Sequence, residues 1–307
     1  MEPIKDFLNY KFYPVSTCNM CGSPSTDHKV LGQRLNQSTG LKPKSKHGIT
    51  VSVLKCKKCG LIFSDPMPVP NDIQDHYGIP PEVYWKDEYF TWDKSYFAGE
   101  IEKLKQVMPV TPGMKALDIG AGLGKCILSL QHAGFDAYGM EPSVPFYERA
   151  VSKMNISKDK LKLGMLENIE YPEKEFDFIT FGAVLEHLYD PADSIRRALK
   201  WLKPGGIIHI EVPSSRHLVG KLINTYYRMI GTNYVTNISP MHSPFHLYEF
   251  DLRSFKMLGE KNDFEVTRAD YFVCEIMFFP RMVKPILAKY MELTNRGMQL
   301  VVWLKRK

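Results

Sequence analysis

A short glycine-rich stretch and an acidic residue downstream of it carry the strongest chemical signal in this chain. Residues 117–124 read Leu-Asp-Ile-Gly-Ala-Gly-Leu-Gly, an apolar strand that ends in a tight turn. Glu141 follows about 20 positions later, at the end of a second apolar run. In a doubly wound α/β fold this arrangement holds an adenosine-containing cofactor, because glycines let the backbone approach the ligand and a carboxylate accepts the ribose hydroxyls.

The spacing of the glycines indicates which cofactor is bound. A dinucleotide fingerprint reads G-x-G-x-x-G, whereas Gly120, Gly122 and Gly124 place the third glycine one residue early. With Asp118 in the strand end, the turn resembles the D-x-G-x-G-x-G turn of class I S-adenosylmethionine (SAM)-dependent methyltransferases. The resemblance implies that SAM is the cofactor, that Asp118 orients the loop or accepts from the methionine ammonium through water, and that Glu141 accepts both ribose hydroxyls.

The same resemblance implies further cofactor contacts. Pro142 shapes the adenine edge, and the adenine amino group meets the loop after the third strand, where Glu167 is the side chain best suited to accept from it. The segment after the fourth strand contains Leu-Glu-His, similar to a signature of many small-molecule methyltransferases, and its backbone lines the methionine arm. An aromatic residue before the first helix caps the methionine carboxylate. The expected contacts are Pro142, Leu166, Glu167, Phe181, Val184 and Tyr96.

Strand and helix patterns alternate from residue 96 onward, which predicts a parallel sheet covered by helices. The expected strands are 115–119, 137–140, 161–164, 176–181, 207–212, 264–272 and 299–304, and the expected helices are 97–107, 125–133, 146–154 and 191–201. The last two strands form an antiparallel hairpin, as in the class I methyltransferase sheet. The expected fold class is α/β: a doubly wound seven-stranded class I methyltransferase sheet, last strand antiparallel, with a small N-terminal zinc-ribbon-like domain.

Four of the six cysteines form two matched Cys-x-x-Cys-Gly motifs, Cys18 with Cys21 and Cys56 with Cys59. Each glycine lets the backbone turn back so that amides point at the sulfurs. Four thiolates make a closed tetrahedral site, and closed zinc sites are structural because a catalytic zinc keeps an open position. The 34-residue gap between the motifs is tolerable, since loop-closure cost grows slowly with length. We expect structural Zn²⁺; unrelated thiols or a redox pair are the alternatives.

The patterns divide the chain into a zinc-binding domain at 1–80, a linker at 81–95, and a methyltransferase domain at 96–307. Two segments exceed the minimal fold, 214–250 and 273–297. Both begin at the strand ends that face the cofactor, where such folds place substrate-binding caps. The three prolines of the stretch 65–70 exclude regular helix and strand there.

The residues most suited to handle the acceptor lie after the fifth strand, in 241–250. Methyl transfer needs the acceptor close to the sulfonium and in line with it, and often a base for the acceptor's proton. Histidine suits that role because its pKa lies near neutrality. We predict His246 as the base, with His242, Tyr248 and Glu249 as site residues, and His187 as the alternative base. The structural alternative is that the acids of this segment cap the following helix and that the histidines only pack against their neighbours.

This layout resembles nucleotide-sugar C-methyltransferases, which also have an N-terminal zinc-binding domain, a class I core and a histidine-containing segment after strand five. In that family a Glu-His pair in the segment performs the acid–base work. Here Phe245 precedes His246, so the pair is broken in the sequence. The resemblance implies a small-molecule acceptor, such as a nucleotide-activated sugar or another biosynthetic intermediate, methylated on oxygen or carbon.

Charge and apolar patterning bound the partners and the location. The formal net charge of +6 fits a soluble protein with surplus lysines, or attraction to a phosphorylated or nucleotide-linked acceptor. No signal-peptide pattern and no run of about 18 apolar residues is present, and the cysteine usage fits a reducing compartment, so we expect a cytoplasmic protein without a transmembrane segment. Apolar stretches at 221–231 and 274–295 are interpreted as lid or homodimer contacts.

These patterns together predict a SAM-dependent methyltransferase, and two alternatives stay open. The first is an RNA methyltransferase, since zinc modules also precede rRNA-modifying cores. Nucleic acid is not favoured, because the basic residues are scattered and no Asn-Pro-Pro-Tyr-type motif follows the fourth strand. The second is a non-catalytic protein of this fold that uses its zinc module to dock a partner.

Overall fold

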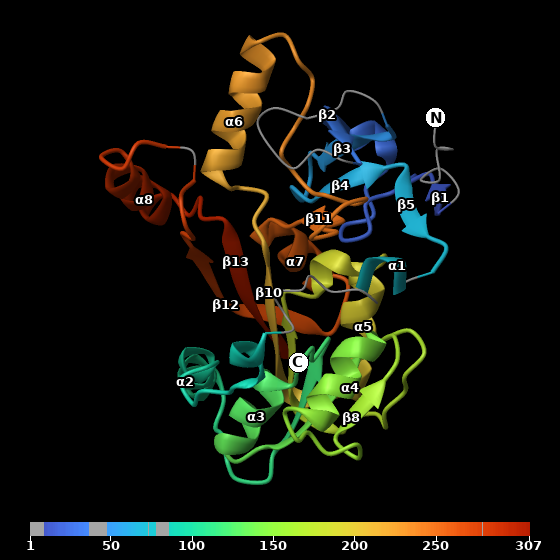
Figure 1. Ribbon diagram of the computed structural model, residues 1–307, viewed down its shortest axis with the longest axis vertical. Coiled ribbons are helices and arrows are strands. Elements are labelled where there is room, and N and C mark those ends of the chain that lie inside the picture. Colours follow the sequence, from blue (N-terminus) through green and yellow to red (C-terminus); the bar gives the residue numbers. More distant parts are fainter. Residues whose placement is uncertain (1–8, 37–47, 73, 78–85, 278) are drawn as a thin grey trace.

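The computed structural model describes residues 9–36, 48–72, 74–77, 86–277 and 279–307. Its central sheet has the strand order β12-β13-β10-β9-β6-β7-β8 (Figure 1). The strands are β6 (Lys115–Ile119), β7 (Asp136–Glu141), β8 (Leu161–Leu163), β9 (Phe176–Gly182), β10 (Leu202–Pro213), β12 (Phe264–Phe272) and β13 (Gln299–Arg306). β13 is antiparallel to both neighbours, and the remaining pairs are parallel. The predicted doubly wound class I methyltransferase sheet, with its last strand antiparallel, is confirmed.

The strand order reverses at β6. The chain runs outward from β6 through β7 to β8 and then returns to β9 and β10 on the other side of β6. Doubly wound folds bind ligands at the carboxyl ends of the strands where the order reverses in this way. The loops that leave β6, β7, β9 and β10 therefore open onto one edge of the sheet.

The central sheet is covered on its two faces by α2 (Ala98–Val107), α3 (Lys125–His132), α4 (Val144–Ser152), α5 (Pro191–Trp201) and α7 (Leu252–Gly259). The other helices of the described chain are α1 (Gln74–Tyr77), α6 (Leu218–Met229) and α8 (Lys284–Leu293). Side chains alternate between the faces along a strand. On β6, Ala116 joins the core formed with α2, α3 and α4, whereas Leu117 joins the core formed with α5 and α7. This two-sided burial explains why the parallel strands read as continuous apolar runs.

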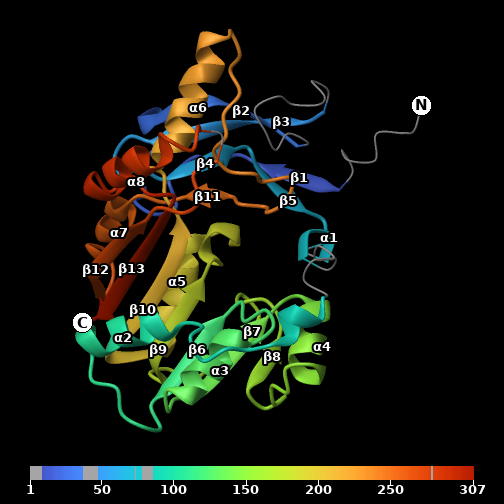
Figure 2. The same cartoon turned by 60° about the vertical axis from the view of Figure 1, so that its left-hand side comes forward.

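A second sheet lies above the central one (Figure 2) and has the order β11-β4-β3-β2. Its strands are β2 (His28–Leu35), β3 (Thr50–Cys56), β4 (Ile62–Asp65) and β11 (Tyr248–Glu249). All its pairs are antiparallel, and β11 comes from the segment that follows β10. Leu54, Phe63 and Tyr248 share one face and join the same core as the residues of α5 and α7. The N-terminal cysteine segment and the 214–250 insertion thus build one sheet together.

The expectation that the proline-rich stretch has no regular structure was wrong. β5 (Met67–Pro70) pairs antiparallel with β1 (Tyr10–Tyr13). In a two-stranded ribbon every second N–H of each strand points away from its partner, so prolines at alternate positions remove no hydrogen bond of the ladder. Residues 1–8, 37–47, 73 and 78–80 of the predicted zinc-binding domain and residues 81–85 of the predicted linker lie outside the described residues.

The insertions carry α6 and α8, which extend from the body at the upper left of Figure 1. The two helices share a small core that includes Leu218 and Met291. The chain after α6 returns along β2, where Tyr234 bridges to Gln33. Farther along, the Glu249 carboxylate accepts from Asn237 Nδ2 at 2.6 Å and from Ile238 N at 3.2 Å. No helix among the described residues is long and apolar enough to span a bilayer.

We expect Glu249→Ala to lower the free energy of unfolding by about 1–3 kcal/mol, because two donors in the loop lose their acceptor. Urea unfolding followed by circular dichroism measures this loss. Glu260→Ala, at the exposed end of α7, is the control and should change the value by less than about 0.5 kcal/mol. An unchanged unfolding free energy in Glu249→Ala would contradict the structural role of this side chain.

Candidate active site and candidate metal centre

The glycine-rich turn joins the carboxyl end of β6 to α3. Gly120, Gly122 and Gly124 have φ angles of 73°, 53° and 79°, a region that residues with a side chain rarely occupy. A Cβ atom at Gly120 would lie 2.5 Å from Val184 Cγ2, and one at Gly124 would lie 2.7 Å from Ile156 Cγ1. At Gly122 a Cβ would meet no heavy atom of the described residues within 4 Å. The turn is closely packed at its ends and open at its centre.

Two buried carboxyl groups lie beside this turn, at neighbouring strand ends. Glu141 ends β7, and its Oε2 and Oε1 accept from Gly122 N at 2.7 Å and Ser143 N at 2.8 Å. Burial raises the pKa of Glu141 to about 7, against the effect of these two donors. Burial and the charge of Glu141 raise the pKa of Asp118 to about 8. A ligand that brings positive charge or hydroxyl donors would stabilise the ionised forms.

The loop after β8 places another acid on the same edge. Leu166 is buried, whereas Glu167 is half-buried, and its Oε2 is sealed from solvent without a hydrogen-bond partner among the described residues. Buried carboxylate oxygens are normally paired, so this oxygen can still accept a hydrogen bond that the described residues do not supply. The carbonyl of Pro142 accepts from Gln74 Nε2 at 3.1 Å, which brings α1 to this edge.

Residues around the ends of β9 and α2 line the other side of the turn. Phe181 is fully buried in the sheet, so only its backbone can face a ligand, while Val184 packs against Gly120. Tyr96 precedes α2 and is about half exposed. Partial burial and the charge of Asp118 raise the pKa of Tyr96, which therefore lies near that carboxyl group.

Three ionisable side chains that are distant in sequence meet just beyond β9. Glu186 and His187 belong to a short 3-10 helix, Leu185–His187, and His246 lies ahead of β11. Nε2 of His246 is 3.8 Å from Glu186 Oε1, and Nε2 of His187 is 4.0 Å from the same oxygen. The imidazole rings are T-shaped, with centroids 4.9 Å apart. We call Glu186, His187 and His246 the acid–base cluster.

Backbone contacts hold the cluster in place. Leu247 N donates to the Glu186 carbonyl at 2.8 Å, and Nδ1 of His187 lies 3.2 Å from the Phe245 carbonyl oxygen. A carbonyl oxygen only accepts, so neutral His187 carries its proton on Nδ1 and has its lone pair on Nε2. Phe245 has a φ of 63°, a sparsely populated conformation of the kind that clusters at functional sites.

Burial favours the neutral form of every member of the cluster. Glu186 is 2% exposed, and its Oε2 has no hydrogen-bond partner among the described residues. Burial, with the charge of Glu211, raises the pKa of Glu186 to about 8. Burial lowers the pKa of His187 to about 4 and, with the charge of His187, lowers that of His246 to about 3. The imidazoles are therefore uncharged acceptors at neutral pH, and an ionised Glu186 would stabilise an imidazolium beside it.

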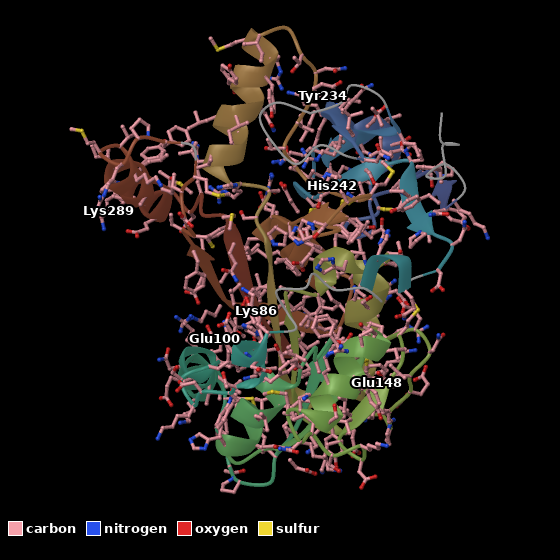
Figure 3. All side chains as sticks on the ribbon, viewed as in Figure 1. Lys86, Glu100, Glu148, Tyr234, His242 and Lys289 are labelled. Atoms are coloured by element: carbon pink, nitrogen blue, oxygen red, sulfur yellow. The ribbon has the colours of Figure 1, made fainter. Side chains whose placement is uncertain are left out.

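The other residues expected on the acceptor side make contacts of a different kind. The Tyr248 hydroxyl is buried and donates to the Tyr189 carbonyl at 2.7 Å, and Glu249 ties down the loop as described above. Nδ1 of His242 lies 3.0 Å from the Ser243 carbonyl oxygen, and Figure 3 shows His242 at the level of the upper sheet. The hydrogen bonds of Tyr248 and Glu249 therefore hold neighbouring loops in place.

The sequence did not predict the carboxylate partner of His246. The expected Glu next to His246 in the chain is replaced by Phe245, and the carboxylate near His246 in the structure is Glu186, from the segment after β9. The available signal was the Leu-Glu-His run directly after a buried strand. Phe245 instead stacks on His76 of α1, with centroids 4.0 Å apart and planes at 14°. Nε2 of His76 lies 2.8 Å from the Tyr10 hydroxyl, so the N-terminal region supports the loop that carries His246.

The two Cys-x-x-Cys motifs converge on one buried cluster. The sulfur–sulfur distances are 3.5 Å for Cys18 and Cys59 and 3.6 Å for Cys21 and Cys56. A disulfide measures about 2.05 Å. Four sulfurs about 2.3 Å from a tetrahedral zinc ion would lie about 3.8 Å apart. Ser23 Oγ lies 3.1 Å from the sulfurs of both Cys21 and Cys56. The donor set and its spacing fit a closed zinc site.

Comparisons with known proteins define the class. The profile of a methyltransferase domain family matches residues 93–269, more than half of the chain, so the chain belongs to that family. A demethylmenaquinone methyltransferase from Geobacillus sp. (strain WCH70) is 29% identical over 131 residues, 40% of this chain and 56% of that relative. A ubiquinone biosynthesis O-methyltransferase from Methylococcus capsulatus (strain ATCC 33009 / NCIMB 11132 / Bath) is 27% identical over 164 residues, 48% of this chain and 65% of that relative.

The alignments cover less than two thirds of these relatives' own length. Among solved structures, an S-adenosylmethionine dependent methyltransferase from Mesorhizobium loti is 17% identical, with 68% of this chain and 98% of that chain aligned and a TM-score of 0.47. The matched family region leaves out the cysteine cluster, which lies before residue 93. Membership of the methyltransferase domain family supports SAM as the cofactor.

The residues at the sheet edge fit SAM. The cofactor carries positive charge, ribose hydroxyls and an adenine amino group. The buried carboxyl groups of Asp118 and Glu141 complement the first two, and the unpaired Oε2 of Glu167 complements the third. The open centre of the turn at Gly122 lets the backbone approach a ligand.

We expect SAM to bind more tightly as pH rises from about 6 to about 8.5. The raised pKa values of Glu141 and Asp118 keep them protonated in the free protein at the lower pH, whereas SAM requires their ionised forms, so binding releases protons there. Calorimetry in buffers of different ionisation enthalpy measures both the affinity and the protons released.

Glu141→Gln should weaken SAM binding by about 10- to 100-fold, since hydrogen bonds to a charged acceptor are lost, and should flatten the pH dependence. Glu148→Gln, on the exposed side of α4 in Figure 3, is the matched control and should leave both unchanged. An affinity that is constant or falls with rising pH would rule out this electrostatic account.

Proposed function

We propose that this chain is a SAM-dependent methyltransferase that transfers a methyl group to a small-molecule acceptor, with His246 as the general base. The observation that carries the proposal is the acid–base cluster. Its Glu186 lies two residues after Val184, and Val184 packs against Gly120 of the glycine-rich turn. Proton removal from an acceptor needs a base held beside the reacting atoms.

In this proposal SAM lies across the carboxyl ends of β6 to β9, where it supplies an electrophilic methyl group when bound. Glu141 accepts the ribose hydroxyls with the lone pairs that its two backbone donors leave free. Glu167 accepts from the adenine amino group, and Asp118 faces the methionine end with Tyr96 near it. The remaining contacts are Gly120, Gly122, Gly124, Pro142, Leu166, Phe181 and Val184.

The acid–base cluster handles the acceptor's proton. His246 is the more exposed of the two histidines, and its neutral ring accepts the proton at Nε2. Glu186, 3.8 Å away, stabilises the imidazolium when it is ionised. His187 is held by the Phe245 carbonyl, beside the ring of His246. The Glu-His pair that the sequence lacks is thus assembled in space from two separate segments.

The acceptor is a small biosynthetic intermediate in this proposal. The matched relatives bear names from quinone biosynthesis, and another from Arabidopsis thaliana, 30% identical over 118 residues, is a phosphoethanolamine N-methyltransferase. The order of cysteine unit, core and histidine segment supports a nucleotide-activated sugar as a further candidate. A base in the cluster weighs against the non-catalytic reading.

A second candidate mechanism uses a metal ion at the acid–base cluster. One ligand atom each from Glu186, His187 and His246 lies within 4.8 Å of the others, and two histidines with one carboxylate form a known type of metal site. The cysteine cluster, in contrast, is buried and closed, and we propose that it holds a structural zinc ion. Its cysteines share a core with Phe63 and Phe250, so zinc stabilises the contact between the two sheets.

We expect His246→Ala to lower turnover by about 10²- to 10⁴-fold and to leave SAM affinity unchanged, because the base is lost and the cofactor edge is intact. Release of S-adenosylhomocysteine measures turnover with the first acceptor found among nucleotide sugars, demethylated quinones and phospho-bases. His187→Asn is the matched comparison and should lower turnover less than His246→Ala does.

The pH profile separates a base from a packing residue. At saturating SAM, kcat/KM for the acceptor should rise in the unchanged chain with an apparent pKa near 8, as the carboxyl group of the coupled cluster ionises. Glu186→Gln should remove that rise. Unchanged turnover in His246→Ala, with an acceptor in hand, would remove His246 from the mechanism.

Metal content distinguishes the two metal proposals. We expect one zinc ion per chain in the unchanged protein and in His246→Ala, and none in Cys56→Ser, which should also lose stability because structural zinc supplies folding energy. Cys274→Ser, outside the cluster, is the control and should keep its zinc. Two metal ions per chain, falling to one in His246→Ala, would favour the metal-assisted mechanism. A stable, zinc-free Cys56→Ser protein would contradict a structural zinc site.

A further inference from the structure

A separate cavity of about 370 Å³ opens between the two sheets and the insertion. It lies where β3, the chain after β10, α6 and the start of α7 meet. Its charged lining consists of Lys55, Arg216, Lys221, Asp251, Arg253 and Lys256. Its volume is in the range of small-molecule sites. None of these residues belongs to the cofactor edge or to the acid–base cluster.

The cavity is lined by five cationic side chains and one acidic side chain, Asp251, which already accepts hydrogen bonds from Arg253. Asp251 is buried and caps α7, and its Oδ1 accepts from Arg253 N at 3.1 Å and Arg253 Nε at 3.4 Å. Lys55, Lys221 and Lys256 form no ion pair with any residue that the structure describes. Among the described residues these three lysines therefore lack a salt-bridge partner, and Asp251 and Glu249 attract Lys55 only from farther away.

Lys55 and Arg216 are partly buried, whereas Lys221, Arg253 and Lys256 are exposed at the rim of the cavity. Burial and the charges of Lys55, Arg296 and Arg216 lower the pKa of Lys221. Burial also lowers the pKa of Lys55, and the charges of Arg253 and Arg216 add to that effect against the attraction of Asp251. Like charges repel at such sites, and a bound anion would relieve the repulsion.

Neighbouring groups fix the position of the Arg216 guanidinium. The Arg216 guanidinium donates to the Thr294 carbonyl at 3.3 Å and lies 5.6 Å from the centre of the Tyr271 ring. Leu252 and Arg253 open α7, so the positive end of that helix also faces the cavity. A donor set that is ordered before binding loses less entropy on binding.

We propose that this cavity binds the phosphate groups of a small molecule, of the diphosphate class. A single carboxylate would balance one of the unpaired cations, whereas a diphosphate matches several at once. Arginine offers a fork that suits phosphate oxygens, and lysine binds them as a point charge. The limited volume of the cavity and the burial of Asp251 suit a small ligand better than an RNA backbone, which requires an extended basic surface.

The cavity and the acid–base cluster lie close together along the chain. Asp251 is five positions after His246, so the two residues are at most about 18 Å apart. The phosphate can therefore belong to the methyl acceptor or to a separate phosphorylated effector. Assignment to the acceptor rests on the proposed function, whereas phosphate binding itself does not.

Calorimetric titration with inorganic pyrophosphate at constant ionic strength tests the site. We expect saturable binding to the unchanged protein, weakened at least about tenfold in Lys221→Gln and in Lys55→Met, which keeps an apolar stem. Lys200→Gln is the matched control: an exposed lysine on α5 that should bind like the unchanged protein. SAM affinity and thermal unfolding should be the same in all variants, so a failed fold or a failed cofactor site would be recognised.

The absence of saturable pyrophosphate binding, or equal weakening in Lys200→Gln, would overturn the proposal. A short RNA that displaced pyrophosphate and depended on the same lysines would overturn the small-molecule assignment. Two outcomes support the proposal and separate the sources. If the phosphate is the acceptor's, uridine diphosphate or pyrophosphate competes with the acceptor, and Lys221→Gln raises KM without changing kcat. If it is an effector's, pyrophosphate changes turnover without competing.

Discussion

The backbone hydrogen bonds of one short segment, 247–250, connect the segments that follow β9 and β10 with the upper sheet. Leu247 N donates to the Glu186 carbonyl, Phe250 N donates to the Pro213 carbonyl, and Ser215 N donates to the Phe250 carbonyl, each at 2.8 Å. Between these contacts the segment forms β11, which completes the upper sheet beside β4. The same few residues therefore place His246 beside the end of β9, join the two sheets and lead into the cap of α7.

At each of the three polar sites, ionisable side chains are buried with fewer hydrogen-bond or charge partners than their charged forms require. Beside the glycine-rich turn this burial raises the pKa of Asp118 to about 8 and that of Glu141 to about 7. At the acid–base cluster it keeps His246 uncharged. In the cavity beside α7 it brings cations together with one occupied acid. A folded chain tolerates such groups at a cost to stability, and perturbed ionisable groups gather where ligands bind.

The upper sheet supports the site as well as the cysteine cluster. Its inner face shares one core with α5 and α7, and that core includes the four cysteines and Phe250. His76 of α1 stacks on Phe245, the residue next to His246. The N-terminal region thus contacts the loop that carries the proposed base. A metal ion at the cysteines would stabilise this contact from a distance, without touching the acceptor.

The sequence by itself determined the central sheet, its fold class, and the glycine-rich turn with Glu141 beside it. These features depend on local signals, namely apolar runs and the spacing of the glycines and Glu141 at the strand ends. The two cysteine motifs likewise predicted their own convergence. Tertiary structure alone decided the partner of His246, the pairing of β11 with β4, and the meeting of Lys55 with Lys221. Those contacts join segments about 60 to 200 residues apart, and no periodicity or spacing in one chain encodes which distant side chains become neighbours.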